Sequence, residues 1–370
     1  MIQGFRHKNA TDTQRPNDGS DYSCAVKTAQ GTLRYGVVGV GRMGRHHVRL
    51  GTQMEGLDLV GVVDRDADRR ADMLEKYGGK GYDHVDALID AGVDVVVIAT
   101  PTIHHRSAAE RLLASGVHCL IEKPLAPSVE EARAIADAAA RSGALLQVGH
   151  VVRYDPVMVA IRKLNLGPPR FMEVDRISPM TFRSVDVGVV LDMMIHDIDV
   201  LLMLMEREPE RVDASAVSVL GEAEDVCNAR LTFPPDKHGH RCVANVTASR
   251  IAMKTERKMR LISPDAYVSA DFQERKGNVI RKTANSARMD QIRADLKVGK
   301  DLSSVNWLEL VSMEPLQVEA GEPLKMQLED FLDAIRQGRK PFVDAEAGFA
   351  AVRTAERIVT AARSLDTGRF

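Results

Sequence analysis

The sequence predicts a protein of two domains, an α/β domain built on a parallel sheet and an α+β domain built on an open-faced, largely antiparallel β-sheet. Strand-like and helix-like runs alternate from residue 33 to about residue 148, which is typical of a parallel sheet with crossover helices. Beyond residue 156, strand-like runs follow one another with little helix, which is typical of antiparallel pairing. The length of 370 residues, 44% of them hydrophobic, provides material for two cores.

The elements divide the chain into four segments. Residues 1–30 are polar and are expected to be a flexible leader, followed by a first domain at 31–152 and a second at 153–345. A helix in residues 346–370 is expected to pack back on the first domain. The Lys- and Arg-rich stretch 275–304 has weak periodicity and is expected to be a mobile excursion of unassigned role. Second-domain strands are expected at residues 170–177, 211–220, 228–233, 241–249, 259–263, 266–272 and 308–318, and helices at 190–206, 324–338 and 346–365.

The residues from Gly39 to Gly44 form a Gly-x-Gly-x-x-Gly motif at the turn from the first strand into the first helix. Gly39 suits the tight turn, Gly41 lets a pyrophosphate approach the backbone, and Gly44 lets the helix pack closely on the strand. The phosphates would rest at the helix N-terminus, with Arg42 and Met43 in the same cofactor-binding turn. A motif in this position predicts a Rossmann dinucleotide-binding domain.

The second strand ends at Asp64, 23 positions past Gly41. An acid there accepts a hydrogen bond from a ribose 2′-hydroxyl and repels a 2′-phosphate, so NAD is favoured over NADP. The neighbouring Arg65 could receive that phosphate if it turned inward, which leaves NADP possible.

Bulk properties exclude several kinds of partner. A formal charge of −2 and an aromatic fraction of 4% give neither the electrostatic footprint nor the stacking platforms of a nucleic-acid-binding protein. No run approaches the roughly 18 apolar residues of a membrane span, so no membrane insertion is expected. The four cysteines lie far apart with no Cys-x-x-Cys pair, so no metal site is expected and a reducing, cytoplasmic location fits.

The ligand crevice of a parallel sheet lies at the carboxyl ends of its strands. Three segments are expected there. They are residues 100–105, with Thr100, Pro101 and His105; the tripeptide Glu122-Lys123-Pro124; and residues 149–154, with His150, Arg153 and Tyr154.

A later helix carries Asp192 and His196, which are four positions apart and so share one face. Polar side chains on an otherwise apolar helix are costly to bury without a partner or a function. An acid favoured by the helix dipole, together with a satisfied core histidine, would also account for this pair.

With these motifs in order, the chain resembles the family of glucose-fructose oxidoreductase, inositol dehydrogenase and the rhizopine-catabolism protein (Gfo/Idh/MocA) from residue 33 to about residue 363. The resemblance implies that Lys123, Asp192 and His196 form the catalytic set and that the peptide bond before Pro124 can be cis. One departure is visible, because many members have paired glycines where this chain has Val187-Gly188.

The chemistry that the resemblance implies is oxidation of a secondary alcohol, with a base for the hydroxyl proton and hydride transfer to nicotinamide. His196 has a pKa suited to proton exchange near neutrality and is the favoured base. Lys123 would polarise the oxygen, or act as the base itself if its pKa were depressed. Asp192 would orient the substrate or the imidazole.

The segments 149–156 and 178–186 resemble the nucleotide-sugar branch of the family, whose members oxidise the sugar at C3. Arg153, Arg176 and Arg183 are candidates to hold a diphosphate or a sugar carboxylate. The specific prediction is therefore a dehydrogenase of UDP-N-acetylglucosamine or its uronic acid. A free sugar or inositol dehydrogenase is the alternative, and an NAD-dependent glycosidase or a non-catalytic NAD(P)-binding sensor are alternatives of other classes.

The second sheet is expected to pair subunits. Apolar residues alternate along 242–248, and so many consecutive strands with few helices leave one face in need of cover. A homodimer or homotetramer through this sheet is the prediction.

Overall fold

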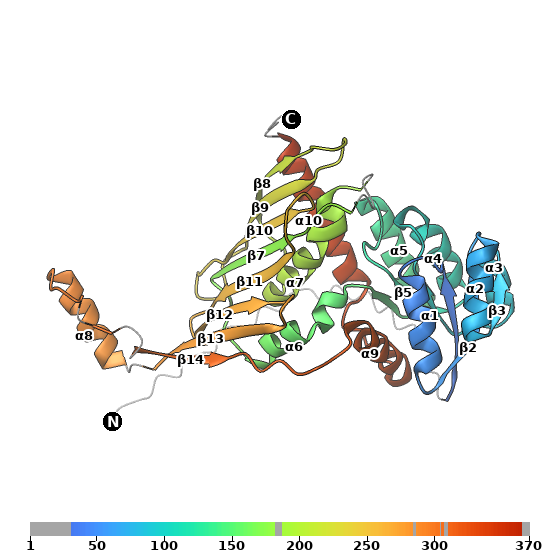
Figure 1. The fold of residues 1–370 in the computed structure, drawn as a ribbon, viewed down its shortest axis with the longest axis horizontal. Coiled ribbons are helices and arrows are strands. Elements are labelled where there is room, and N and C mark those ends of the chain that lie inside the picture. The colour runs from blue at the N-terminus through green and yellow to red at the C-terminus, as the bar shows by residue number, and fades with distance from the viewer. Residues whose placement is uncertain (1–30, 182–186, 284–285, 304, 307–309, 365–370) are drawn as a thin grey trace, which may run out of the picture.

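A computed structural model describes residues 31–181, 187–283, 286–303, 305–306 and 310–364. The expected leader at 1–30 lies outside the described residues. Figure 1 shows two domains side by side, with the chain passing from the first to the second and its last two helices lying between or beneath them. The predicted fold class, a parallel-sheet domain followed by an open-faced sheet domain, is confirmed.

The first domain contains a six-stranded sheet in which every neighbouring pair is parallel. The strand order is β3-β2-β1-β4-β5-β6. Strands β2 and β3 are therefore added on one side of β1, and β4, β5 and β6 on the other. The central strands are uniformly apolar because helices cover both faces, and all four residues of β4 are buried. The strands are β1 (Leu33–Val38), β2 (Leu57–Val63), β3 (Lys80–Tyr82), β4 (Val95–Ile98), β5 (His118–Ile121) and β6 (Leu146–Val148).

The helices on this sheet come from both ends of the chain. Leu328, Phe331 and Leu332 of α9 (Pro323–Gln337) are fully buried in one cluster with Leu33 and Tyr35 of β1. A segment nearly 300 residues downstream therefore completes the core of the first domain. The other helices of this domain are α1 (Gly44–Gln53), α2 (Ala67–Tyr77), α3 (Val85–Asp90), α4 (His105–Ala114) and α5 (Val129–Ser142).

The second domain contains an eight-stranded sheet in the order β14-β13-β12-β11-β7-β10-β9-β8. All its pairs are antiparallel except the central pair β7 and β10. Alternate residues point to the two faces, and helices cover one face only. The strands are β7 (Phe171–Ile177), β8 (Arg211–Val217), β9 (Val226–Thr232), β10 (Val243–Ser249), β11 (Glu256–Ile262), β12 (Ala266–Asp271), β13 (Lys276–Lys282) and β14 (Val311–Pro315).

The expected excursion at 275–304 is only partly such a segment. It begins with β13, which pairs with β12 and β14 as an ordinary member of the sheet, and continues into α8 (Ser286–Lys297). The apolar alternation that predicts a strand is weak in β13, because Lys276, Arg281 and Lys282 lie on either side of its few apolar residues. Figure 1 shows α8 standing away from the sheet, at the end of the molecule farthest from the first domain.

Helix α6 (Pro156–Lys163) was not expected, although Asp155 caps it through a bond from the amide of Val157 at 2.9 Å and Pro156 occupies its first turn. The helix expected at 190–206 is present as a π-helical turn, Val190–Met194, followed by α7 (Ile195–Met205).

The last helix, α10 (Ala345–Ser364), contacts both domains. Arg133 of α5 forms an ion pair with Glu346 at 2.8 Å and lies 3.7 Å over the ring of Phe349. Val352 and Ile358 are buried in the same cluster as residues of α7 and of the second sheet. Helix α10 thus connects the first domain to the helical segment that carries Asp192 and His196.

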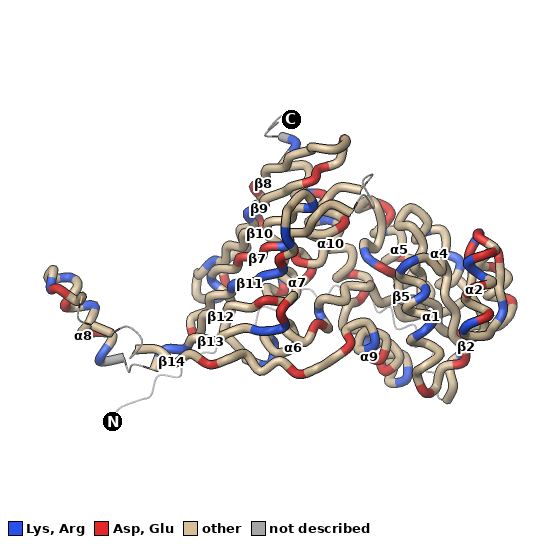
Figure 2. The backbone as a smooth tube through the Cα atoms, in the orientation of Figure 1, with Lys and Arg blue, Asp and Glu red and all other residues tan. Residues whose placement is uncertain are grey.

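Charged residues are spread over both domains, with basic and acidic positions interspersed along the chain (Figure 2). Within the described part of the chain, no helix is long and apolar enough to cross a membrane.

Candidate active site

The glycine turn has the backbone that its motif requires. Gly39 has a φ of 84°, and a Cβ there would lie 2.7 Å from the amide nitrogen of Thr100. A Cβ on Gly44 would lie 1.8 Å from the carbonyl oxygen of Gly39, so only glycine lets α1 start this close to the turn. A Cβ on Gly41 would meet nothing within 4 Å. The backbone at Gly41 is therefore open to a ligand.

A cleft of about 770 Å³ opens in front of this turn. Its size is within the usual range for small-molecule sites. Among the predicted cofactor-binding residues, it is lined by Gly39, Gly41, Arg42, Met43, Asp64, Arg65, Thr100 and Pro101.

Asp64 is fixed at the edge of this cleft by two backbone donors. The amide of Val40 donates to its Oδ2 at 2.9 Å and the amide of Asp66 to its Oδ1 at 3.0 Å. Two arginines that sequence reasoning did not single out, Arg69 and Arg111, also line the cleft, and each forms an ion pair with a carboxylate. The charges in the cleft that affect the choice between NAD and NADP are thus the carboxylate of Asp64 and the guanidinium of Arg65.

His105 does not line the cleft. Its imidazole is buried, with Nδ1 3.1 Å from the carbonyl oxygen of Pro124 and Nε2 3.0 Å from that of Thr100. Burial lowers the pKa of His105 despite these carbonyls. Through these two contacts His105 joins two of the strand-end segments, and its role at the cofactor stays a prediction.

Lys123 lies at the end of β5, in a cis peptide bond with Pro124. Its Nζ donates to the carbonyl oxygen of Asp192 at 2.6 Å and lies 3.3 Å from Asp192 Oδ1. The lysine is thereby held across the domain boundary against the first turn of the π-helix. The sequence predicted that Lys123 and Asp192 belong to one site, and the structure brings them into contact.

Glu122 points away from the lysine into the core, where its Oε1 lies 2.8 Å from Nε2 of His47. Burial alone would raise the pKa of Glu122, but the hydrogen bond and the positive charges of His47 and Lys123 outweigh it and lower that pKa. His47 is on α1, so this pair joins the glycine-turn helix to the strand that ends at Lys123. Sequence reasoning did not identify His47.

His196 is half-buried at the start of α7, and its Nδ1 is buried with no hydrogen-bond partner among the described residues. Burial, followed by the positive charges of Lys123 and Arg176, lowers the pKa of His196 well below 6.5. The imidazole is therefore neutral at physiological pH. Asp192 contacts Lys123, and no described bond joins it to His196.

Two of the predicted substrate-binding arginines are committed to ion pairs. Arg153 Nη2 lies 2.6 Å from Asp199 Oδ1, and Arg176 Nη2 lies 2.7 Å from Asp197 Oδ1, with a second hydrogen bond completing each pair. The four side chains are at most 10% exposed. Both aspartates belong to α7 and follow His196 in the sequence, so the arginines hold that helix in place through these pairs.

Tyr154 is also buried, and its hydroxyl donates to Asp330 Oδ2 at 2.7 Å. His150 is fully buried, with both ring nitrogens unpartnered among the described residues. Arg183 lies outside the described residues. Of the predicted substrate-binding set, Asp192 and His196 are thus the described members that stay available.

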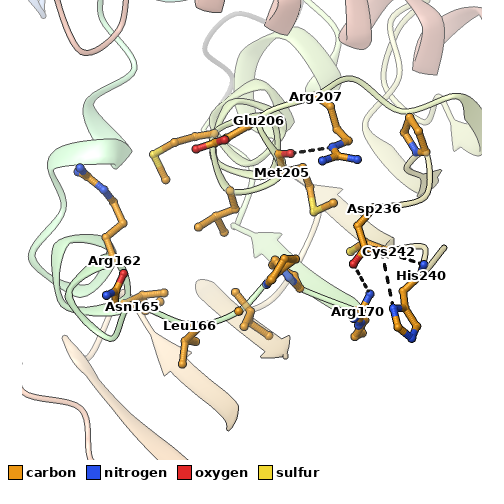
Figure 3. Close-up of a pocket in the computed structure, with 18 of the residues that line it drawn as sticks. Arg162, Asn165, Leu166, Arg170, Met205, Glu206, Arg207, Asp236, His240 and Cys242 are labelled. Carbon is orange, nitrogen blue, oxygen red and sulfur yellow. Dashed lines mark hydrogen bonds and ion pairs between the residues drawn. The ribbon is translucent and has the colours of Figure 1, made fainter. Parts of the chain in front are cut away.

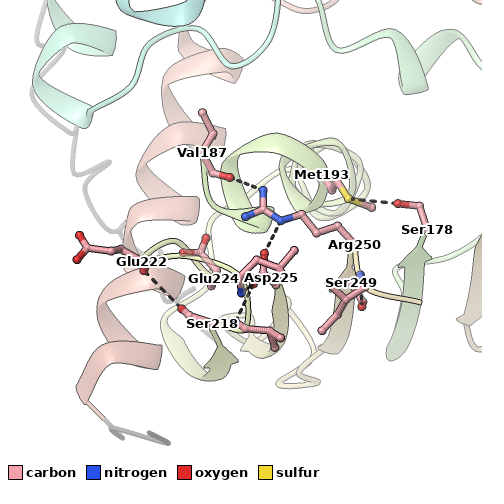
Figure 4. A network of polar contacts seen from close by, with 12 residues as sticks. Ser178, Val187, Met193, Ser218, Glu222, Glu224, Asp225, Ser249 and Arg250 are labelled. Carbon is pink, nitrogen blue, oxygen red and sulfur yellow. Dashed lines mark hydrogen bonds and ion pairs between the residues drawn. The ribbon is translucent and has the colours of Figure 1, made fainter. Parts of the chain in front are cut away.

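A buried network fixes the chain just before the π-helical turn (Figure 4). Arg250 donates to Asp225 Oδ1 at 2.7 Å and to the carbonyl oxygen of Val187 at 2.6 Å. Burial alone would raise the pKa of Asp225, but the backbone amides and Arg250 that surround it lower the pKa. A Cβ on Gly188 would lie 2.0 Å from Oε1 of Glu224, so a larger residue there would have to displace the Glu224 side chain.

A second hollow of about 470 Å³ lies at the opposite end of α7 (Figure 3). Its rim includes the ion pair of Arg170 with Asp236 at 2.9 Å, and Met205 and Cys242 lie within it. It contains none of the predicted site residues. The cleft at the glycine turn, together with the contact of Lys123 with Asp192 at the end of β5, is therefore the candidate active site.

The glycine-turn cleft on a parallel sheet is typical of a dinucleotide-binding enzyme. The chain matches the oxidoreductase family with an NAD-binding Rossmann fold over residues 33–150 and the GFO/IDH/MocA C-terminal domain over residues 156–263. The chain belongs to the Gfo/Idh/MocA family.

One relative is similar over nearly the full chain. The UDP-N-acetylglucosamine 3-dehydrogenase of Acidithiobacillus ferrooxidans is 34% identical over 316 residues, which cover 85% of this chain and 93% of the relative. A solved structure of UDP-N-acetylglucosamine 3-dehydrogenase GnnA from that organism superposes with a TM-score of 0.79 at 32% identity, covering 91% of this chain and 99% of that one. An inositol 2-dehydrogenase of Rhizobium meliloti is 30% identical but matches 52% of this chain and 61% of its own.

Proposed function

We propose that the protein oxidises the C3 hydroxyl of a UDP-linked N-acetylated sugar with NAD as acceptor. The observation that carries this proposal is the contact of Lys123 with Asp192 in a chain that has an open glycine-turn cleft and is similar over most of its length to a UDP-N-acetylglucosamine 3-dehydrogenase. Inositol dehydrogenases are also similar to this chain, one at 30% identity over 52% of it and another at 27% over 89%, so an inositol or free sugar is the second candidate.

The residues of the cleft fit a bound NAD, because the backbone at Gly41 is open and the cleft has the size of a small-molecule site. A bound nicotinamide supplies the hydride acceptor. The Lys123 ammonium, fixed by the Asp192 carbonyl, stabilises negative charge that develops on the reacting oxygen. His196, kept neutral by its lowered pKa, takes the hydroxyl proton.

NAD is the preferred cofactor in this proposal. The carboxylate of Asp64 lies at the cleft edge, held by Val40 and Asp66 in a geometry that suits a ribose 2′-hydroxyl and opposes a 2′-phosphate. Arg69 is neutralised by Asp66 and Arg111 by Asp86, so two of the cleft arginines have carboxylate partners.

A panel of nucleotide sugars, free sugars and inositols, read by absorbance at 340 nm, tests the proposal. NADH formation with UDP-N-acetylglucosamine or its uronic acid, and little with the other two classes, is expected. Turnover of inositol alone would support the second candidate. Release of a free sugar with no net NADH would indicate a glycosidase of the same fold.

The open face of the second sheet is proposed to bind a second copy of this chain. At one end of the strands, a row of apolar side chains runs across this face from strand to strand, in register on neighbouring strands. Ile262 is 40% exposed and Met313 54% exposed, which is costly for a free surface. The row consists of Val243, Phe171, Ile262, Tyr267, Ile280 and Met313.

A symmetric dimer would bury this row against its own copy. Because α8 stands away from the sheet, the chain's own 275–304 segment does not provide this cover (Figure 1). Light scattering is expected to show a dimer or tetramer, and Ile262→Lys should shift the mass toward a monomer. A wild-type mass near the 40.7 kDa of one chain would contradict the proposal.

A further inference from the structure

Arg257 and Arg176 lie directly opposite each other on the neighbouring strands β11 and β7. In an antiparallel pair, opposite residues point to the same face with their Cβ atoms about 5 Å apart. Both arginines are on the face that packs toward α7, because Met259 and Val174, two residues away on each strand, are buried there.

The two guanidinium groups share one carboxylate between them. Asp197 accepts from Nε and Nη2 of Arg176, both at 2.7 Å, so each of its oxygens is engaged. Arg257 forms no ion pair with a carboxylate among the described residues. Like charges directly opposite each other on a sheet are destabilising, so this pair carries one uncompensated positive charge.

Asp155 is the other acid near this pair. Its Oδ1 accepts from the amide of Val157, where it caps α6, and it makes no ion pair with Arg257 in the described structure. Arg257 is exposed as a residue, although burial of its guanidinium lowers its pKa. It is a cation that no described carboxylate holds in an ion pair.

Arg257 lies beside α7, the helix that carries His196. A crevice is lined jointly by Arg176, Asp197 and Arg257, and Asp197 follows His196 in the sequence. The positive charge of Arg257 is also among those that lower the pKa of His196, after burial and nearer charges such as Lys123 and Arg176.

We propose that Arg257 binds the diphosphate of the substrate, in the role that the sequence had suggested for Arg153 and Arg176. This inference rests on the proposed function, because it assumes a sugar that carries an anionic group. A guanidinium binds phosphate through paired N–H donors, and the uncompensated charge of the arginine pair is neutralised when the anion arrives. The carboxylate of a uronic acid also accepts paired hydrogen bonds from a guanidinium. It is therefore the alternative to the diphosphate as the group that Arg257 would bind.

The test compares Arg257→Ala with a matched control, Arg241→Ala. Arg241 is an exposed arginine just before β10, at the far end of the sheet, where it pairs with Glu210. Each variant removes one positive charge. For Arg257→Ala, KM for UDP-N-acetylglucosamine is expected to rise about 10- to 100-fold, the usual effect of losing a charge-assisted hydrogen bond, with kcat changed little.

Binding of UDP alone, measured by calorimetry in the presence of NAD, gives a readout that does not depend on turnover. It is expected to weaken by a similar factor in Arg257→Ala, to be partly restored in Arg257→Lys, and to be unchanged in Arg241→Ala. NAD affinity and melting temperature are expected to stay at wild-type values, which excludes misfolding as the cause.

Unchanged KM and UDP affinity in Arg257→Ala would overturn the inference, provided that the wild type oxidises the nucleotide sugar. A KM increase seen with the uronic acid but not with UDP-N-acetylglucosamine would also overturn it, because it would assign Arg257 to the carboxylate. A wild type that neither oxidises the nucleotide sugar nor binds UDP would instead contradict the proposed function itself.

Discussion

Asp199→Asn tests whether Arg153 is a structural residue. The substitution keeps the shape of the side chain but removes the charge that Arg153 contacts through two nitrogens at 2.6 and 2.8 Å. Asp199 is fully buried and Arg153 is 7% exposed, so the arginine is left as an uncompensated buried charge. Removing one partner of such a pair typically costs about 3–5 kcal/mol of unfolding free energy.

The assay is urea-induced unfolding, with fluorescence and circular dichroism followed together because the protein has two domains. Lys163→Ala is the surface control, since Lys163 and Glu319 form an ion pair with side chains 58% and 77% exposed. That control is expected to lose less than about 1 kcal/mol. The double variant Arg153→Met/Asp199→Leu should recover most of the loss, because an apolar pair of similar volume is often as stable as a buried ion pair.

The reasoning would be refuted if Asp199→Asn cost no more than the surface control. It would also be refuted if Arg153→Met kept wild-type stability and specifically raised KM for the nucleotide sugar. Either result would restore Arg153 to the substrate-binding role that the sequence suggested.

Three further predictions concern the active site. Lys123→Ala and His196→Ala are each expected to lower kcat about 100-fold or more, with NAD affinity in a fluorescence titration nearly unchanged; full activity of either variant would remove that residue from the chemistry. Asp64→Ala is expected to weaken NAD binding and to reduce the difference between the affinities for NAD and NADP. A wild type that already binds NADP more tightly than NAD would contradict the predicted preference for NAD. The acid limb of the kcat/KM profile is expected well below pH 6.5, because His196 must be neutral and its pKa is lowered. In Lys123→Ala the acid limb of the remaining activity is expected at higher pH, because the lysine charge that lowers the His196 pKa is removed. An acid limb at the wild-type pH would mean that a group other than His196 titrates there.

The parts of the site that sequence predicted are those set by local backbone. The glycine turn depends on close approaches at Gly39 and Gly44 within a few residues and at the neighbouring strand end, so its residue types are diagnostic. The lysine at the end of β5 follows from parallel topology, which brings all strand ends to one edge.

The contacts of Arg153 and Arg176 that the sequence did not predict depend on partners that are distant in sequence. The packing of α7 decides whether Arg153 and Arg176 contact substrate or an aspartate. That packing cannot be read from the pattern of residues around either arginine. Asp197 and Asp199 did offer a signal, because two acids in an apolar helix require buried partners. The Asp225–Arg250 pair gave no local signal, since its members are 25 positions apart on different strands and loops.

The most direct test of the central claim is hydride transfer from C3. UDP-N-acetylglucosamine carrying deuterium at C3 is incubated with the protein and NAD, and the nicotinamide product is examined by mass spectrometry. The proposed function predicts that the deuterium is recovered on the reduced nicotinamide and that its presence slows the hydride step. NADH formed without deuterium would mean that another carbon reacts, and no reduction at all with this substrate would contradict the account.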